Sequence, residues 1–166
     1  MFKNIGKLFS FLDYPTVKRI KSPFEGNILP SDLIKNSIIS NNIIGPSVAV
    51  IPTSDTLRAP CDGVIKAVSE KNNALIIEVG KVELLLNAGL NPQKYPSELF
   101  DLKIRKGDKV TTGTPLLSFN INTLNQIDQC FLCVLTVRQV KTLRSYSFTS
   151  DKKVFFDTVL FKLNTW

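Results

Sequence analysis

The sequence predicts an all-β antiparallel domain, because short apolar or alternating runs follow one another from residue 22 onward, separated by Gly, Pro and Asp. Such punctuation is typical of strands joined by tight turns. Helical periodicity is weak over the same region. The expected strands are Gly26–Leu29, Ser47–Ile51, Val64–Val68, Ala74–Val79, Val82–Leu86, Pro115–Phe119, Phe131–Val137 and Val154–Leu163. The expected short helical turns are Ser31–Lys35, Ser97–Phe100 and Thr123–Ile127.

A repeated segment indicates a duplicated β unit. Residues 22–28 (SPFEGNI) and 59–65 (APCDGVI) begin 37 positions apart and share a small residue, Pro, an acid, Gly and Ile. Pro fixes φ on entry to a turn, the acid can bond its own backbone, and Gly accepts conformations that other residues avoid. Residues 105–117 repeat the order of turn, short strand, turn and buried strand.

Length and composition fit one domain. The 166 residues are 43% hydrophobic and 21% charged, enough for a sizeable core. The longest apolar runs, such as Val48–Ile51, fall far short of the roughly 20 residues that span a bilayer. Lys3 and Lys7 interrupt any apolar segment of a secretory signal. We therefore expect a cytoplasmic protein without a transmembrane helix.

The cysteines support the same compartment. Cys61, Cys130 and Cys133 are an odd number for a disulfide framework and suit a reducing environment. Cys130 and Cys133 form a CxxC pattern, but no second pair and no histidine is present to complete a zinc site. No metal and no cofactor are expected.

The formal net charge of +7 is concentrated near the N-terminus. Residues 1–21 hold five basic residues against Asp13 alone, and the rest of the excess is spread over residues 22–166. No basic run interleaved with aromatic residues and no nucleic-acid-binding module is visible, so nucleic acid is not an expected partner. The sequence thus divides into a basic arm with its linker, residues 1–21, and a folded domain, residues 22–166.

The first 13 residues predict a short amphipathic helix, in which apolar residues recur at helical spacing. Two hypotheses remain open: a helix that lies on an anionic membrane surface, and an arm or helix packed on the domain. Tyr14–Lys21 is interpreted as the linker. The residues of the membrane hypothesis are Phe2, Ile5, Leu8, Phe9 and Leu12, with Lys3 and Lys7.

Three segments carry a resemblance to a known family: Ala59–Ile65 (APCDGVI), Asn72–Ala74 (NNA) and Val82–Gly89 (VELLLNAG). In this order the chain resembles, over Ser22–Asn164, the glucose-type enzyme IIA component of the bacterial phosphoenolpyruvate-dependent sugar phosphotransferase system. The resemblance implies a compact antiparallel β-sandwich or barrel built from a duplicated hybrid motif. It also implies a role in sugar transport.

In that family one histidine carries a phosphoryl group and a second stabilises it. The resemblance places those histidines at Asn73 and Asn87, and this chain contains no histidine at all. Imidazole offers an unprotonated nitrogen near neutral pH, whereas a carboxamide nitrogen is neither basic nor nucleophilic. The family residues at Pro46, Lys71 and Asn91 have changed too. We therefore expect a catalytically degenerate component, a pseudoenzyme with a regulatory role.

The resemblance also implies protein partners. These are the histidine phosphocarrier protein, the IIB domain of a sugar permease, and regulated transporters or enzymes. The apolar residues expected to meet them are Val48, Leu75, Leu85 and Ala88. An exposed apolar face without a phosphorylation site favours binding that does not depend on phosphorylation.

Two alternatives remain. The chain could be a working phosphocarrier that uses another acceptor, for which Cys61 is the candidate thiol, although nothing near it in sequence lowers its pKa. It could also be an unrelated carrier domain of hybrid-barrel type. Such domains attach a cofactor to a hairpin lysine in a Met-Lys-Met or Asp-Lys-Ala context, and neither Lys71 nor Lys81 has those neighbours.

Overall fold

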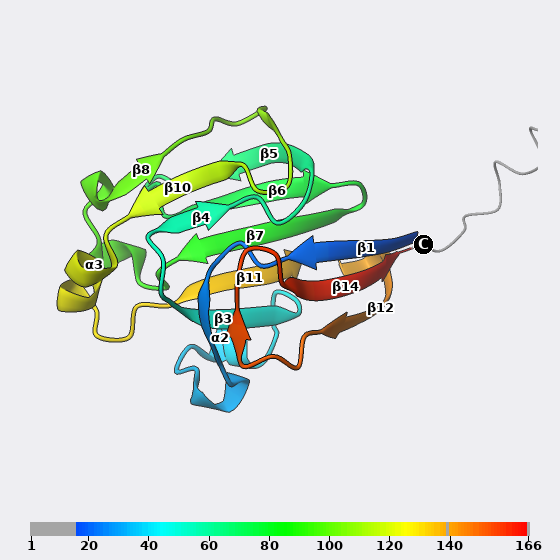
Figure 1. Cartoon of the computed structure of the whole chain (residues 1–166), viewed down its shortest axis with the longest axis horizontal. Coiled ribbons are helices and arrows are strands. Elements are labelled where there is room, and N and C mark those ends of the chain that lie inside the picture. Colours follow the sequence, from blue (N-terminus) through cyan, green and yellow to red (C-terminus); the bar gives the residue numbers. More distant parts are fainter. Residues whose placement is uncertain (1–15, 139, 166) are drawn as a thin grey trace, which may run out of the picture.

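The computed structural model describes residues 16–138 and 140–165, and it consists mainly of β-strands (Figure 1). The strands are β1 (Thr16–Lys21), β2 (Gly26–Leu29), β3 (Ser47–Pro52), β4 (Thr56–Arg58), β5 (Gly63–Val68), β6 (Ala74–Val79), β7 (Val82–Ala88), β8 (Phe100–Leu102), β9 (Lys109–Val110), β10 (Pro115–Phe119), β11 (Cys133–Arg138), β12 (Leu143–Phe148), β13 (Lys153–Val154) and β14 (Val159–Thr165). The α-helices are α2 (Ser37–Ser40) and α3 (Ile121–Ile127). The 3-10 helices are η2 (Ser31–Leu33), η3 (Pro92–Lys94), η4 (Ser97–Leu99) and η5 (Val140–Thr142).

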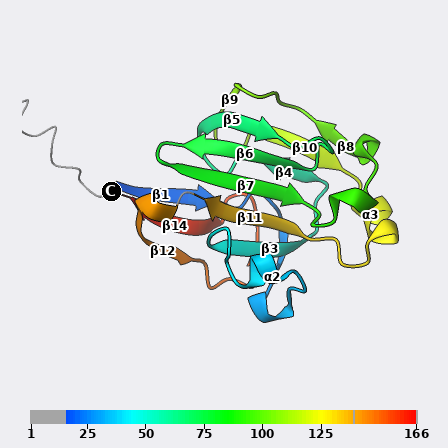
Figure 2. The same cartoon turned by 180° about the vertical axis from the view of Figure 1, so that it is seen from behind.

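Three antiparallel sheets form a sandwich. The large sheet has eight strands in the order β13-β2-β3-β11-β7-β6-β5-β9, and two small sheets have the orders β1-β14-β12 and β4-β10-β8. The small sheets lie in front in Figure 1, and the large sheet faces the viewer when the molecule is seen from behind (Figure 2). The core between the layers buries large side chains such as Phe24, Tyr95, Phe131 and Phe161. The expected all-β sandwich is confirmed; the sheets do not close into a barrel.

Most expected strands are present. Three coincide with β2, β6 and β10, and four others differ by one or two residues at their ends. The expected strand Val154–Leu163 is wrong, because a turn divides it into β13 and β14. In that turn the Phe155 N–H donates to Thr158 Oγ1 at 3.0 Å, and the Thr158 N–H donates to the Phe155 carbonyl at 3.0 Å.

The linker expected over Tyr14–Lys21 is wrong from Thr16 onward, because these residues form β1, which pairs with β14 along its length. Only Ile20 of this strand is fully buried. The strand therefore lacks the alternation of apolar and polar residues by which a strand is predicted from sequence. The short strand expected within residues 105–117 is β9, whereas β4, β8, β12 and α2 were not predicted. The amphipathic helix expected over residues 1–13 lies outside the described residues.

The repeated segments occupy equivalent places and bond to each other. The Lys21 N–H donates to the Pro60 carbonyl, and the Arg58 N–H donates to the Pro23 carbonyl, both at 3.0 Å. Since residues 21 and 58 are 37 apart, as are residues 23 and 60, the two bonds are reciprocal. The strand pairings follow the same relation, because Gly26 pairs with Val154 of β13 and Gly63 pairs with Val110 of β9. The duplication inferred from sequence is therefore visible in the backbone.

Gly26, which follows the first of these two turns, tests whether the close approach of β2 to β3 matters for stability. Its φ is +154°, and a Cβ atom there would lie 2.1 Å from the Ile51 carbonyl oxygen, so Gly26→Ala should lower the free energy of unfolding by about 3 kcal/mol. The matched control is Gly113→Ala, where φ is +88° but no atom lies within 4 Å, with an expected loss of about 1 kcal/mol. Urea denaturation of both variants measures the difference; equal losses would show that the close approach does not matter.

Candidate functional site

Asn73 and Asn87 meet on the outer face of the large sheet. Asn73 immediately precedes β6, Asn87 lies in β7, and Ala74 is the cross-strand partner of Asn87. Both asparagines line one depression of about 460 Å³. The other residues around it include Ser69, Glu70, Lys71, Leu90 and Pro92. The structure thus brings together Asn73, Asn87 and Lys71, as the resemblance implies.

The amide of Asn73 is buried and held by hydrogen bonds. Its side chain is 2% exposed. Its Nδ2 donates to the carbonyls of Ala88 at 3.3 Å and Gly89 at 3.4 Å, and its Oδ1 accepts from Ser69 Oγ at 3.1 Å. The Ser69 hydroxyl in turn accepts from the Ala74 N–H. Asn73 therefore ties the turn before β6 to the end of β7.

Asn87 is different, because its side chain makes no hydrogen bond within the part of the chain that the structure describes. It is half-buried in a strand whose side chains alternate between the two faces. Leu84, Leu86 and Ala88 point into the core, so Asn87 lies with Leu85 on the outer face. Its donors and acceptor are available to a partner or ligand.

The partner face expected from sequence is largely wrong. Val48, Leu75 and Ala88 are 7%, 2% and 0% exposed and belong to the core between the sheets. Only Leu85 lies on the outer face. The physical reason is the two-residue period of a strand: residues one position apart point to opposite faces, so a pattern of apolar residues alone does not show which set is exposed.

A different apolar surface borders the asparagines. Ile34 and Ile39, from η2–α2, pack on Ala49 of β3 and Val134 of β11, and Val134 is the cross-strand partner of Asn87. Figure 2 shows α2 beside β3 on this face. The segment leaves apolar side chains exposed: Leu33 by 61%, Ile38 by 46%, Ile43 by 67% and Ile44 by 41%. In the sequence this surface is marked by the pairs Ile38-Ile39 and Ile43-Ile44, which lie outside the motifs that carry the family resemblance.

The other altered residues are dispersed. Lys71 is exposed at the depression, but Pro46 is buried under a separate hollow that includes Tyr146. Asn91 lies beyond the rim, where its Nδ2 donates to Asp128 Oδ2 at 3.0 Å. Unlike Lys71, therefore, Pro46 and Asn91 do not share the depression with the asparagines.

Asp128 anchors the loop beside the depression, and sequence reasoning missed it. It is 7% exposed and accepts from Tyr95 Oη at 2.7 Å as well as from Asn91. Burial alone would raise the pKa of Asp128, but the hydrogen bonds from Asn91, Tyr95 and the Cys130 N–H, with the charge of Lys94 3.9 Å away, outweigh it and lower the pKa. The carboxylate is therefore ionised at neutral pH.

A second buried carboxylate, Glu83, lies two residues before Leu85 on the outer face and is 4% exposed. It bonds to Lys66, and Arg138 Nη1 lies 3.6 Å from its Oε2. The hydrogen bond to Glu83 is the main cause that raises the pKa of Lys66. Glu78, the cross-strand partner of Glu83, lies 3.8 Å from Lys66 and completes a neutral group of four charges.

The cysteines offer no nucleophile at this site. Burial raises the pKa of Cys61 to about 12, and this residue precedes β5, at the end of the strand opposite to Asn73. The six residues of β5 separate the two by roughly 20 Å. Cys133 is fully buried, and burial raises its pKa as well. Within residues 16–138 and 140–165 no group of His, Cys, Asp and Glu could hold a metal ion, and no helix is long and apolar enough to span a membrane.

Comparison with known proteins identifies the family. The family model for the phosphoenolpyruvate-dependent sugar phosphotransferase system, EIIA 1, matches residues 18–142. The chain belongs to this EIIA family. It is 26% identical over 166 residues to the glucose-specific EIIA component of Oceanobacillus iheyensis, covering 96% of this chain and 99% of that protein.

Two further relatives agree. The β-glucoside-specific EIIBCA component of Bacillus subtilis is 29% identical over 136 residues, which cover 81% of this chain and 22% of that longer protein. The structure of glucose permease IIA from Mycoplasma capricolum superposes with a TM-score of 0.74 at 19% identity, covering 88% of this EIIA chain and 96% of that one. The shared fold is therefore that of an EIIA component.

The lowered pKa of Asp128 predicts a pH-dependent stability. A carboxylate with a folded-state pKa below its unfolded value stabilises the fold above the unfolded pKa, and this contribution is lost as the pH falls through the folded value. Asp128→Asn should therefore cost about 2 kcal/mol at pH 7, with the difference shrinking toward pH 2. Urea denaturation across this range measures it, with the exposed Asp32→Asn as control. A difference that stays constant with pH would contradict the assignment.

Proposed function

We propose that this chain is a catalytically degenerate glucose-type IIA component, which binds protein partners without carrying a phosphoryl group. In this proposal Asn73 and Asn87 occupy the positions of the two family histidines. The observation that carries it is the meeting of these two asparagines in one depression, in an EIIA chain without a single histidine.

The chemistry of the amide supports this proposal. A carboxamide can occupy the volume of an imidazole and form hydrogen bonds, but its nitrogen lone pair is delocalised and cannot attack a phosphoryl group. Asn73 uses its amide to hold the end of β7, which preserves the shape of the site. An imidazole restored at position 73 would have to displace these bonds, and imidazoles at both positions would still lie beside Lys71.

The alternative acceptor is poorly placed. Cys61 is about 20 Å away by the length of β5, and its raised pKa keeps the thiol protonated at neutral pH. A working phosphocarrier that uses this thiol is therefore disfavoured. The carrier-domain alternative also lacks support, since the chain matches the EIIA family and neither Lys71 nor Lys81 has the attachment context.

The proposed partners are those of a phosphotransferase component: the histidine phosphocarrier protein, a IIB domain, or a regulated transporter or enzyme. Relatives named EIIBCA carry the B, C and A components in one protein, which favours a IIB domain. We propose that the partner contacts Leu85, the amide of Asn87 and the exposed isoleucines Ile38, Ile43 and Ile44. Because phosphorylation cannot switch this face, the chain acts as a permanent mimic of the dephosphorylated form.

The proposed location is the cytoplasm, where these partners are found, with peripheral contact at the inner face of the membrane. The residues proposed for that contact belong to the arm that precedes β1, in which Lys3 and Lys7 accompany the apolar positions of the amphipathic pattern. We propose that the folded IIA unit starts at β1 and that residues 1–15 act as the arm.

Binding of a glucose-type IIB domain tests the partner face. Leu85→Glu and Ile43→Glu should each weaken the complex by about tenfold or more, because each places a charge in an apolar contact. Val17→Glu, an exposed apolar residue on β1, is the matched control and should bind normally. Titration calorimetry against both the IIB domain and the phosphocarrier protein measures the affinities. Unchanged affinity in the two outer-face variants would overturn this assignment.

A further inference from the structure

The small sheet β1-β14-β12 has an uneven charge. Its three strands contain five basic residues and no acidic residue, so they account for most of the net charge of +7. The connection from β12 to β14 leaves this balance unchanged, because Asp151 and Asp157 are matched by Lys152 and Lys153. The basic residues of the sheet are Lys18, Arg19, Lys21, Arg144 and Lys162.

The duplication supplies an internal comparison. The equivalent sheet, β4-β10-β8, contains one basic residue, Arg58, and one acidic residue, Asp101. Both sheets cover the same core and have the same order of equivalent strands. The fold therefore does not require an excess of positive charge on this sheet, although Lys18 is used within the fold, where its Nζ donates to the Val79 carbonyl at 3.3 Å.

Two of these cations face each other. Arg19 and Lys162 are direct cross-strand partners, and both are exposed. Like charges directly opposite each other destabilise a sheet. In residues 16–138 and 140–165 neither side chain forms an ion pair with a carboxylate, although a depression of about 620 Å³ beside them includes Asp151 and Asp157. Such a pair suits an external surface rich in negative charge.

Exposed aromatic side chains lie on the other face of this sheet, because Tyr146 and Phe148 pair with Leu163 and Phe161, which point into the core. Tyr146 and Phe148 on β12 are 46% and 58% exposed, and their rings stack with centroids 6.3 Å apart. Val17 on β1 is 60% exposed. Val17 and Arg19 are two positions apart on β1 and share the outer face with Lys162, so the exposed cation pair has one exposed apolar neighbour there.

We propose that the sheet β1-β14-β12 docks on an anionic lipid bilayer. Charge complementarity favours this occupant, because the exposed pair Arg19 and Lys162 has no carboxylate partner among residues 16–138 and 140–165. Anionic headgroups attract basic side chains that are held at the membrane surface. The inference does not depend on whether Asn73 and Asn87 replace histidines.

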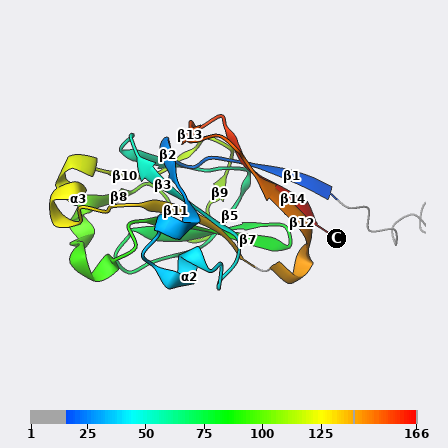
Figure 3. The same cartoon turned by 90° about the horizontal axis from the view of Figure 1, so that it is seen from below.

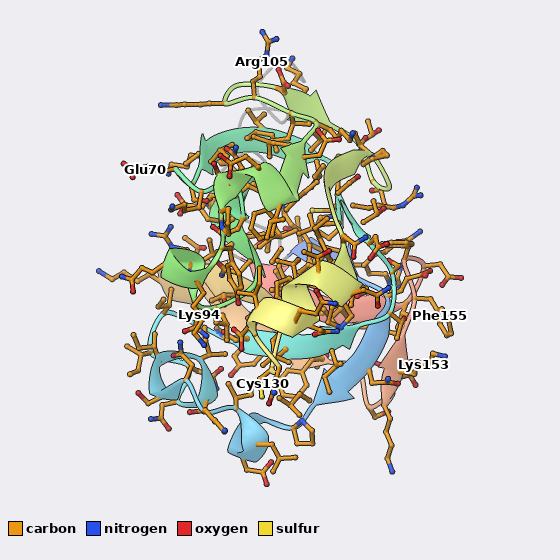
Figure 4. The ribbon with its side chains drawn as sticks, turned by 90° about the vertical axis from the view of Figure 1, so that its left-hand side faces the viewer. Glu70, Lys94, Arg105, Cys130, Lys153 and Phe155 are labelled. Carbon is orange, nitrogen blue, oxygen red and sulfur yellow. The ribbon has the colours of Figure 1, made fainter. Side chains whose placement is uncertain are left out.

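This docking orients the molecule. In the view from below, β1 lies on the opposite side of the molecule from α2, which belongs to the partner face (Figure 3). The end view likewise separates Glu70 and Lys94, near the depression, from Lys153 and Phe155, in the β12–β14 connection (Figure 4). With β1 on the bilayer, the depression with Asn73 and Asn87 stays open to protein partners, whereas the loop that carries Ile43 and Ile44 lies beside β12 at the edge of the docking sheet.

Vesicle co-sedimentation of the full chain tests the proposal. We expect binding to vesicles of phosphatidylglycerol and phosphatidylcholine in equal parts, weaker binding at high salt, and little binding to phosphatidylcholine alone. Arg19→Glu with Lys162→Glu should lower the affinity at least about tenfold. The control, Lys106→Glu with Lys109→Glu, makes the same change of charge at exposed residues of another edge and should stay within about twofold of the unmodified chain. Equal losses in the two double variants, or none in either, would overturn the assignment of this sheet.

A labelling experiment tests the orientation. Ser147 is exposed on β12 and is the cross-strand partner of Lys162, so Ser147→Cys in a Cys130→Ser background should lose reactivity toward a soluble maleimide when vesicles are added. Cys130 of the unmodified chain, exposed on the loop after α3, should keep its reactivity. Protection of Cys130 instead of the cysteine at position 147 would show that the molecule binds by another face.

Discussion

The reciprocal crossing of two turns is the constraint on which the rest of the structure depends. The bonds from Lys21 to Pro60 and from Arg58 to Pro23 join the two copies of the repeat. In each copy a glycine, Gly26 or Gly63, brings its strand so close to the neighbouring strand that a Cβ atom would lie within 3 Å of a backbone oxygen. The crossing thereby fixes where the large sheet begins in both halves, and β7 and β11 at its centre carry the outer face of the site.

Much of this fold is predictable from the sequence, because apolar alternation and turn residues report local structure directly. The repeat at residues 22–28 and 59–65 even contains the two halves of the crossing. The strands that were missed are short or polar: β12 has no buried residue, and β1 buries only Ile20. Their pairing with β14 comes from tertiary contacts that no local pattern reports.

The site was predictable in part. Motif order places Asn73 and Asn87, and the sheet brings them together, but the choice of Val48, Leu75 and Ala88 as a partner face required the register of each strand. Asp128 and Glu83 are equally invisible in sequence, because their burial depends on Tyr95 and on Arg138 from distant segments. What emerges is a molecule with two unlike sides: an apolar surface around two amides, and a basic sheet whose duplicate is neutral.

Incubation of the chain with phosphoenolpyruvate and the two general phosphotransferase proteins, followed by intact-mass analysis at neutral pH, tests the central claim most directly. A histidine-containing EIIA component serves as the positive control, and Asn73→His with Asn87→His shows whether imidazoles alone restore transfer. We expect no added mass on the unmodified chain and inefficient transfer to the double variant. A stable gain of one phosphoryl group by the unmodified chain would contradict the degenerate site and would direct attention to Cys61.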